Sequence, residues 1–271
     1  MAHPQIAAFA RLADGGQTPT RRIFGQASLL SRTVHDVRYN DVDDTIIVPS
    51  PFASSILTFR GGADGQEAPI RVIQGGNSRI GGSRLAIDTV HREIFSFGRG
   101  GIQVFPMDGN GDVAPLRVIS GSNTMRPSES IAVDPINNLI AATGENESIL
   151  IFNRTDNGNV KPLRVIQGPN TMIDRINQMQ IYPGTKSLIV AMPGQQGVVE
   201  PPRVFVGVWS LDDNGDVPPR YRIFGNTTTM KKPFGIALNP LHKEIIVSDM
   251  RLNGVVTFSF PELFDQPAST R

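Results

Sequence analysis

The sequence predicts an all-β protein, a β-propeller built from four-stranded antiparallel blades. Three observations lead to this fold class. The phrase Pro-x-Arg-x-Ile-x-Gly recurs with a period of about fifty residues, each period contains three further short apolar runs, and Asn-Gly or Asp-Gly turns lie between such runs. A sheet of four short strands cannot bury both of its faces alone, so the repeats must stack against one another to form a core.

The glycine that closes each phrase marks the end of a repeat. These residues are Gly25, Gly75, Gly121, Gly168 and Gly225. After each glycine we expect a loop and then three strands, before the next Arg-x-Ile segment forms the fourth. The expected first strands are 36–40, 84–89, 130–135, 179–184 and 235–240; the second are 45–50, 93–98, 139–144, 187–192 and 244–249; the third are 55–59, 101–105, 148–152, 204–209 and 255–258.

The third strand occurs once more than the others, because the segment from Ile6 to Pro19 copies that from Ile56 to Pro69. Residues 21–24, as the outer strand of the last repeat, would close a five-bladed ring and leave Ile6 to Phe9 over. A sixth blade that lacks its inner strands is the alternative. A third hypothesis makes Ile6 and Phe9 a self-association strand that pairs with another molecule.

We therefore expect a single β-propeller domain over residues 1–271. Its repeats run approximately over 26–75, 76–121, 122–168, 169–225 and 226–258, and the last is closed by the N-terminal strand within 6–25. The plentiful turn formers, 27 Gly and 21 Pro, fit many short strands joined by tight connections.

The first-strand phrase resembles the NHL-repeat family of propellers, and "PFGIALN" from Pro233 to Asn239 matches it best. The resemblance covers nearly the whole chain but rests on structural residues. It implies a β-propeller, usually with six blades, and implies little about activity.

Composition limits the function classes. The 26 Lys and Arg nearly balance the 25 Asp and Glu, and no basic run exceeds two residues, so we expect no nucleic-acid partner. No apolar stretch approaches the roughly 20 residues of a membrane span, so we expect no membrane partner. The chain has no cysteine, which removes disulfides and thiolate sites. No signal peptide is visible; the location is unknown, and secretion is expected if the N-terminus was trimmed.

Candidate functional residues are those expected at the mouth of the propeller channel, on first strands and the loops that lead into them. They are His35, Asp36, Arg84, Glu129, Asp174 and Asn177. A second group lies in and after the segment "PGQQGVVEPPR" (193–203), which lengthens the fourth repeat. Because insertions into repeat scaffolds commonly map to the binding face, Gln195, Gln196 and Trp209, the single tryptophan, are binding candidates, with a tolerated loop extension as the alternative.

Repeated polar residues are better explained by structure. The arginine of the repeated phrase recurs in four copies, as Arg21, Arg71, Arg117 and Arg164, whereas a catalytic residue is needed once. The loop positions occupied by Met125, Met172 and Met230 hold Leu30 and Ile80 in other repeats, which indicates packing. Asp108-x-Asn110-x-Asp112 has calcium-loop spacing but lacks the later Gly and Glu of an EF-hand, so we interpret it as a hairpin turn, with weak calcium binding as the minor alternative.

We therefore expect a noncatalytic scaffold for protein–protein interaction or self-assembly, without a cofactor. The alternative is a metal-dependent hydrolase, similar to the lactonase-like propellers, or a lyase, with a divalent cation at the channel mouth held by some of Asp36, Glu129, Asp174 and Asn177.

Overall fold

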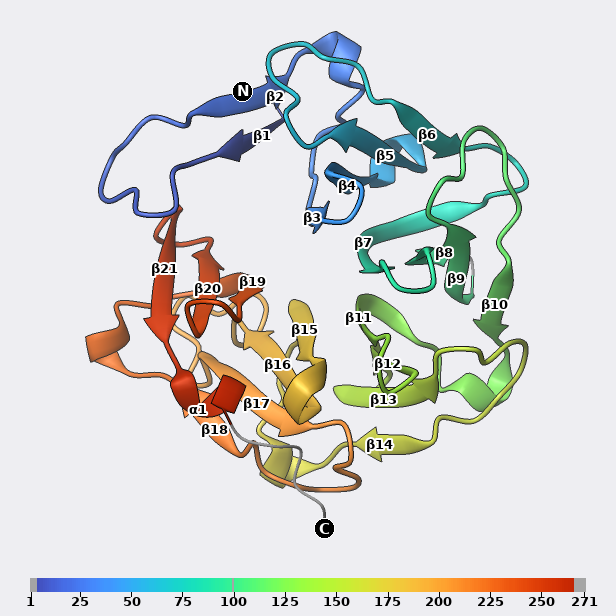
Figure 1. Ribbon diagram of the computed structural model, residues 1–271. Coiled ribbons are helices and arrows are strands. Elements are labelled where there is room, and N and C mark those ends of the chain that lie inside the picture. Colours follow the sequence, from blue (N-terminus) through green and yellow to red (C-terminus); the bar gives the residue numbers. More distant parts are fainter. Residues whose placement is uncertain (1–3, 99, 266–271) are drawn as a thin grey trace. The chain divides into compact units, whose positions relative to one another are not determined.

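The computed structural model describes residues 4–98 and 100–265, whose regular secondary structure is almost entirely β-strand (Figure 1). The predicted fold class is confirmed: the chain is an all-β, five-bladed propeller with four-stranded antiparallel blades. It divides into two compact units, residues 1–99 with 103–116 and residues 100–102 with 117–271. The prediction of one domain stays a prediction.

Four blades have all four strands. These are β3 (Arg38–Asn40), β4 (Thr45–Ser50), β5 (Ser55–Arg60) and β6 (Arg71–Gln74); β7 (Ile80–Asp88), β8 (Glu93–Gly98), β9 (Gly101–Pro106) and β10 (Arg117–Ser120); β11 (Ser128–Asp134), β12 (Leu139–Gly144), β13 (Ser148–Asn153) and β14 (Arg164–Ile166); and β15 (Gln178–Tyr182), β16 (Ser187–Met192), β17 (Phe205–Ser210) and β18 (Tyr221–Ile223). The fifth described blade has three strands, β19 (Pro233–Asn239), β20 (Glu244–Asp249) and β21 (Gly254–Ser259).

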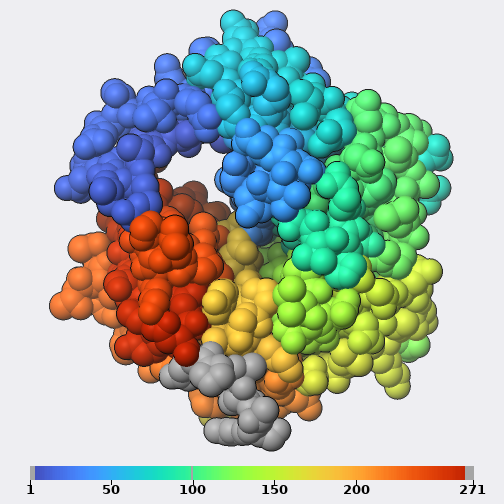
Figure 2. All heavy atoms as spheres, in the orientation of Figure 1, coloured from blue at the N-terminus to red at the C-terminus, as the bar shows by residue number. Residues whose placement is uncertain are grey.

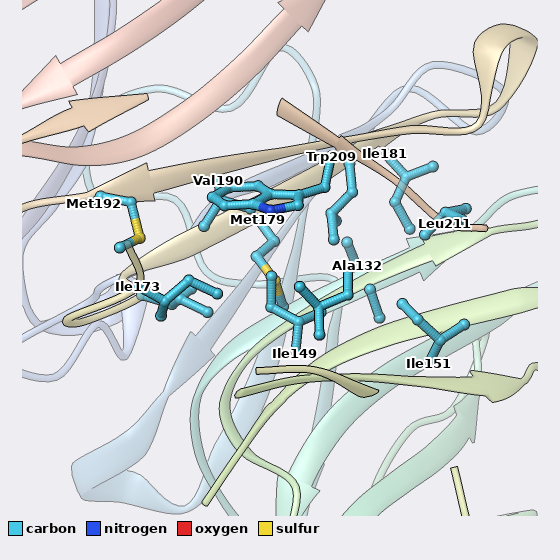
Figure 3. Packing of buried hydrophobic residues seen from close by; sticks show 14 of the residues in the cluster. Ala132, Ile149, Ile151, Ile173, Met179, Ile181, Val190, Met192, Trp209 and Leu211 are labelled. Atoms are coloured by element: carbon cyan, nitrogen blue, oxygen red, sulfur yellow. The ribbon is translucent and has the colours of Figure 1, made fainter. Parts of the chain in front are cut away.

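The predicted strands occur where the repeat places them, because each is a short β-branched run bounded by turn residues. The middle strands are apolar on both faces; in β12 and β13 nearly every residue is buried. In the first unit Ile47, Ile56, Ile94 and Phe105 belong to one apolar cluster. A corresponding cluster of the second unit contains Trp209, Val190 and Met179, whose side chains gather around one another in Figure 3.

Short helices complete the chain. Five-residue α1 (Pro261–Asp265) follows β21, and single 3-10 turns occur at η1 (Gln26–Ser28), η2 (Pro51–Ala53), η3 (Ser122–Thr124), η4 (Pro169–Thr171), η5 (Pro183–Thr185) and η6 (Asn226–Thr228). Leu30, Ile80 and Met230 are buried after the repeat glycines, and Met125 and Met172 at the equivalent positions are half-buried, which agrees with the packing interpretation.

In each of the four complete blades, the Asx-Gly turn between the third and the fourth strand bonds to the fourth strand of the preceding repeat, a contact that we call the clasp. In one clasp, Asp64 Oδ1 accepts a hydrogen bond from the Arg22 N–H at 2.8 Å. The Gly65 N–H donates to the Arg22 carbonyl at 2.7 Å, and the Gly65 carbonyl accepts from the Phe24 N–H at 2.9 Å. Gly65 has a φ of +66°, which a side chain would strain.

The clasp recurs three times along the described chain, each time with an asparagine opposite a valine. The pairs are Asn110 with Val72, Asn157 with Val118 and Asn214 with Val165. The glycine of each turn forms a parallel bridge with the isoleucine of the repeated phrase. The turns that have calcium-loop spacing are therefore hairpins, as predicted, and their side-chain oxygens accept backbone hydrogens.

The two ends of the repeat array differ from its middle. The N-terminal hairpin consists of β1 (Gln5–Ala8) and β2 (Arg21–Phe24), and pairs Ile6 with Ile23 as β5 pairs Ile56 with Ile73. At the other end, no described fourth strand pairs with β21, and Val255 there is 64% exposed. The described contacts do not include closure by the N-terminal strand, which stays a prediction.

Candidate functional site

Asp36, a predicted site residue of the first unit, lies in a buried polar cluster. Its side chain is fully buried and pairs with Arg38 at 3.1 Å. It also accepts hydrogen bonds from the backbone N–H groups of Val37 at 2.9 Å and Leu85 at 3.0 Å. Desolvation raises the pKa of the Asp36 carboxyl, and the positive charge of Arg38 opposes that shift. With its oxygens already occupied, Asp36 holds the start of β3 against β7.

His35 and Arg84 lie near this cluster. Arg84 is buried, whereas His35 is largely exposed. Partial desolvation lowers the pKa of the His35 imidazole, and the charge of Arg84 lowers it further. The structure thus brings His35, Asp36 and Arg84 together, but their arrangement makes His35 a weak proton acceptor rather than an activated base.

Two predicted residues of the second unit, Glu129 and Asp174, line one pocket of about 220 Å³. Glu147 and Arg175 also line it. Glu129 and Glu147 both have left-handed backbone, with φ of +58°, a conformation that side chains other than Gly rarely adopt. Asn177, two residues beyond Arg175, is buried within the blade instead.

The inserted segment 193–203 is fixed to the second unit at two points. Arg203 Nη1 donates to Asp174 Oδ1 at 2.9 Å, beside the pocket. Arg251 Nη1 donates to the carbonyl of Val199 at 2.7 Å. The base of the loop is tight: Gly194 has a φ of +78°, and a Cβ there would lie 2.4 Å from the Pro201 ring. This segment is therefore an ordered loop with a defined conformation.

The tip of this loop presents side chains to solvent. Gln195 and Gln196 are exposed, as are the apolar Val198 and Val199, the latter to 75%.

Trp209, which follows the loop in β17, is fully buried, and its ring lies among Val190, Met179 and other labelled side chains in Figure 3. Its indole Nε1–H donates to the Val217 carbonyl at 3.3 Å. Packing accounts for Trp209, which offers no surface to a partner in this structure.

The remaining predicted residues lie on the N-terminal hairpin. Ile6 pairs with Ile23 in the β1–β2 sheet, and Phe9 beyond it is 52% exposed. Figure 2 shows this segment, in dark blue, as a thin arc of atoms. No described strand pairs with the second edge of β1, so self-association through Ile6 and Phe9 stays a prediction.

The lactonase-like alternative requires acidic or histidine side chains that converge on one metal ion. Over residues 4–98 and 100–265, no group of three or more His, Asp or Glu side chains is placed to hold a metal ion. The same residues contain no helix with the length and apolarity needed to cross a bilayer.

The sequence pattern missed the residues that organise these sites. Arg38 could have been found, because it follows Asp36 by two positions and so lies on the same side of a strand. Arg203 and Arg251 could not have been found from the sequence, because their partners, Asp174 and the carbonyl of Val199, lie in other loops. Glu147 carried no signal beyond its position in the loop before a third strand, whereas the position of Arg175 near the expected channel mouth could be read from the sequence.

Comparison with known proteins supports the fold but gives no information on function. No family model matches the chain, and no curated protein matches its sequence. A chain of the crystal structure of the mitotic checkpoint complex is similar in structure, with a TM-score of 0.58 and 15% identity. The match covers 90% of this chain and 67% of that chain. The resemblance to NHL-repeat propellers stays a prediction.

Proposed function

We propose that this protein is a noncatalytic β-propeller scaffold that binds another protein through the loop 193–203 and the adjoining pocket. The observation that carries the proposal is the loop itself, which is fixed by Arg203 and Arg251 and exposes Val198 and Val199 at its tip. A loop that is already ordered loses little conformational entropy on binding. Exposed apolar and amide side chains on such a loop are typical of a protein-binding surface.

The surroundings of the loop support a protein partner. The pocket beside Asp174 carries the carboxylates of Glu129 and Glu147, for which the described residues supply no ion pair, and adds a polar, negatively charged rim. A partner would place apolar side chains on Val199 and a basic side chain toward this rim. The similar chain from a multiprotein assembly agrees with a scaffold role.

Affinity capture with three baits tests the proposal: the unaltered chain, Val199→Asp and Leu241→Asp. Leu241, 84% exposed in the β19–β20 turn, is the matched control for a new surface charge. We expect a partner that the unaltered chain and Leu241→Asp retain, and that Val199→Asp retains roughly tenfold less, as for the loss of about 1.4 kcal/mol. Titration of the purified partner must give the same order. Equal capture by all three baits would overturn the proposal.

A further inference from the structure

The chain contains four Asn-Gly pairs, and three of them belong to clasps. The clasped pairs are Asn110-Gly111, Asn157-Gly158 and Asn214-Gly215, and the fourth pair, Asn253-Gly254, joins β20 to β21. An asparagine side chain reacts most readily with the next backbone nitrogen when that nitrogen belongs to glycine, because no Cβ hinders the approach. The four pairs therefore share one local chemistry and differ in what holds them.

A clasp restrains both groups that must meet in this reaction. In the second unit, Asn157-Gly158 is held by Val118: the glycine N–H donates to the valine carbonyl at 2.7 Å, and the asparagine Oδ1 accepts from the valine N–H at 3.0 Å. Asn214-Gly215 is held by Val165 through the same two bonds, also at 2.7 and 3.0 Å. The glycine nitrogen reaches the asparagine side chain only after the turn has left its strand, because both bonds must break first.

Asn253 lies in the same unit but its side chain has no such restraint. The turn 250–253 is fixed at its start, where Asp249 Oδ1 accepts from the N–H groups of Arg251 at 2.9 Å and Leu252 at 3.0 Å. Asn253, at the end of the turn, is exposed, and its side chain makes no hydrogen bond within the described part of the second unit. Its φ of +50° is left-handed, a conformation that asparagine tolerates better than most residues. Reaction at Asn253 therefore calls for movement within one turn, not for separation of two repeats.

This turn also anchors the loop 193–203. Arg251 Nη1 donates to the Val199 carbonyl at 2.7 Å, and Arg251 Nη2 lies 3.8 Å from Glu200 Oε1. Both contacts depend on where the turn holds the backbone of Arg251. A change two residues later that lengthens the main chain and adds a negative charge alters the position of Arg251 and its electrostatic surroundings.

We infer that Asn253 deamidates spontaneously in the folded protein, and that the product weakens the anchor between Arg251 and Val199. The Gly254 nitrogen bonds to Asn253 Cγ and gives up its proton, and the side-chain amide leaves as ammonia. Water then opens the resulting cyclic imide. Addition of water at the former side-chain carbon gives aspartate, and addition at the main-chain carbonyl gives isoaspartate, whose main chain is longer by one methylene.

The reaction consumes one water molecule, releases one molecule of ammonia and needs no enzyme or partner. The inference therefore does not rest on the proposed binding function. If no partner is captured through the loop 193–203, the deamidation of Asn253 and its effect on the loop remain to be measured on the isolated chain.

Peptide mapping by mass spectrometry tests the site, because all four Asn-Gly pairs react in one sample. At each pair, the rate in the folded chain at mildly alkaline pH is divided by the rate in the chain unfolded in guanidinium chloride, which removes the effect of local sequence. We expect this ratio to be at least about tenfold higher at Asn253 than at the three clasped asparagines, whose reaction waits for the clasp to open. A smaller difference overturns the inference, including one caused by any contact that covers the turn 250–253.

Hydrogen exchange of the segment 193–203 tests the effect on the anchor. Asn253→Gly is the matched control, because glycine adopts a positive φ without strain and has no side chain to react. We expect the segment to exchange at least about twofold faster in deamidated protein than in fresh protein, and at an unchanged rate in Asn253→Gly after the same incubation. Thermal unfolding of each sample controls for the fold. Unchanged exchange in deamidated protein, or equal acceleration in Asn253→Gly, overturns the effect on the anchor.

Discussion

Asp112 accepts a hydrogen bond from the backbone N–H of Asn77, 35 residues earlier in the chain, at 2.8 Å. The same oxygen accepts from the Ser78 N–H at 3.1 Å, and Oδ2 accepts from the Asn77 side chain at 3.1 Å. Asp112 stands just after the clasp glycine of its turn, so one turn holds both the fourth strand and the loop that follows it. Asp216 makes the equivalent bonds to Asn170.

Asp112→Ala should lower the free energy of unfolding by about 1 kcal/mol, because two backbone donors lose their acceptor. Asp112→Asn should retain most of that stability, since Asn159 makes the same kind of bond to the Asn123 N–H at 2.7 Å. Urea denaturation measures both. Asp108→Ala, an exposed change in the same turn, is the control, and an equal loss there would contradict the assignment.

Calcium should not change stability through these turns. Both Asp112 oxygens already accept hydrogen bonds, and Asn110 Oδ1 accepts from the Val72 N–H. We expect the same melting temperature in excess chelator and in millimolar calcium. A calcium-dependent rise that Asp112→Ala abolishes would instead support the calcium-loop interpretation.

Arg38→Met should destabilise the fold by about 3–5 kcal/mol at neutral pH, because it leaves the Asp36 carboxylate buried without its counter-charge. Acid should relieve part of this loss, since protonation of Asp36 removes the buried charge. The difference between variant and unaltered chain should therefore begin to shrink at a pH above the ordinary value of 3.8, because burial raises the pKa of Asp36 and the loss of Arg38 raises it further. Denaturant titrations at several pH values measure it. Asp36→Asn combined with Arg38→Met should recover stability at neutral pH; failure to do so would assign the loss to packing.

His35 should make stability depend on pH near neutrality. Its folded pKa lies below the ordinary value of 6.5, so the unfolded chain binds the proton more readily. Stability from this group is complete above 6.5 and falls as pH falls toward the lowered value. The melting temperature of His35→Gln should decline less over that range. Identical pH profiles would show that His35 does not titrate differently in the folded state.

Trp209 should report on the core rather than on a partner. Its emission should be blue-shifted and resistant to acrylamide, and Trp209→Ala should cost about 3–5 kcal/mol of stability. Partner binding at the loop should leave its emission nearly unchanged. Ready quenching in the folded chain would contradict its burial.

The fold could be predicted from the sequence because its signals are local and repeated. An Asx-Gly turn and an alternating apolar strand can each be recognised from a few residues. Because the repeat occurs five times, a strand that is irregular in one copy can be identified by alignment with the others. The clasp could not be predicted, because Asp64 meets Arg22 across 42 residues and only the packing of repeats brings them together. The equivalence of the N-terminal hairpin to residues 55–74 was visible, but its pairing in the folded chain was not.

The candidate site was predictable in position but not in contacts. The length of the 193–203 insertion marked the loop, whereas Arg203 and Arg251 act from outside the motif. In the sequence, Trp209 stands out as the single tryptophan and by its place after the insertion. The period of two along β17 carried the better signal, because it puts Trp209 on the same face as Phe205, a buried residue of the same apolar cluster.

The clasp joins each repeat only to the one before it. A whole repeat could therefore be added or removed between two closing glycines, and every remaining turn would still find a fourth strand to hold. The clasp therefore does not determine how many blades the chain has. Blade number in such a chain is free to drift by duplication or loss of a gene segment, while the rules that join one blade to the next stay the same.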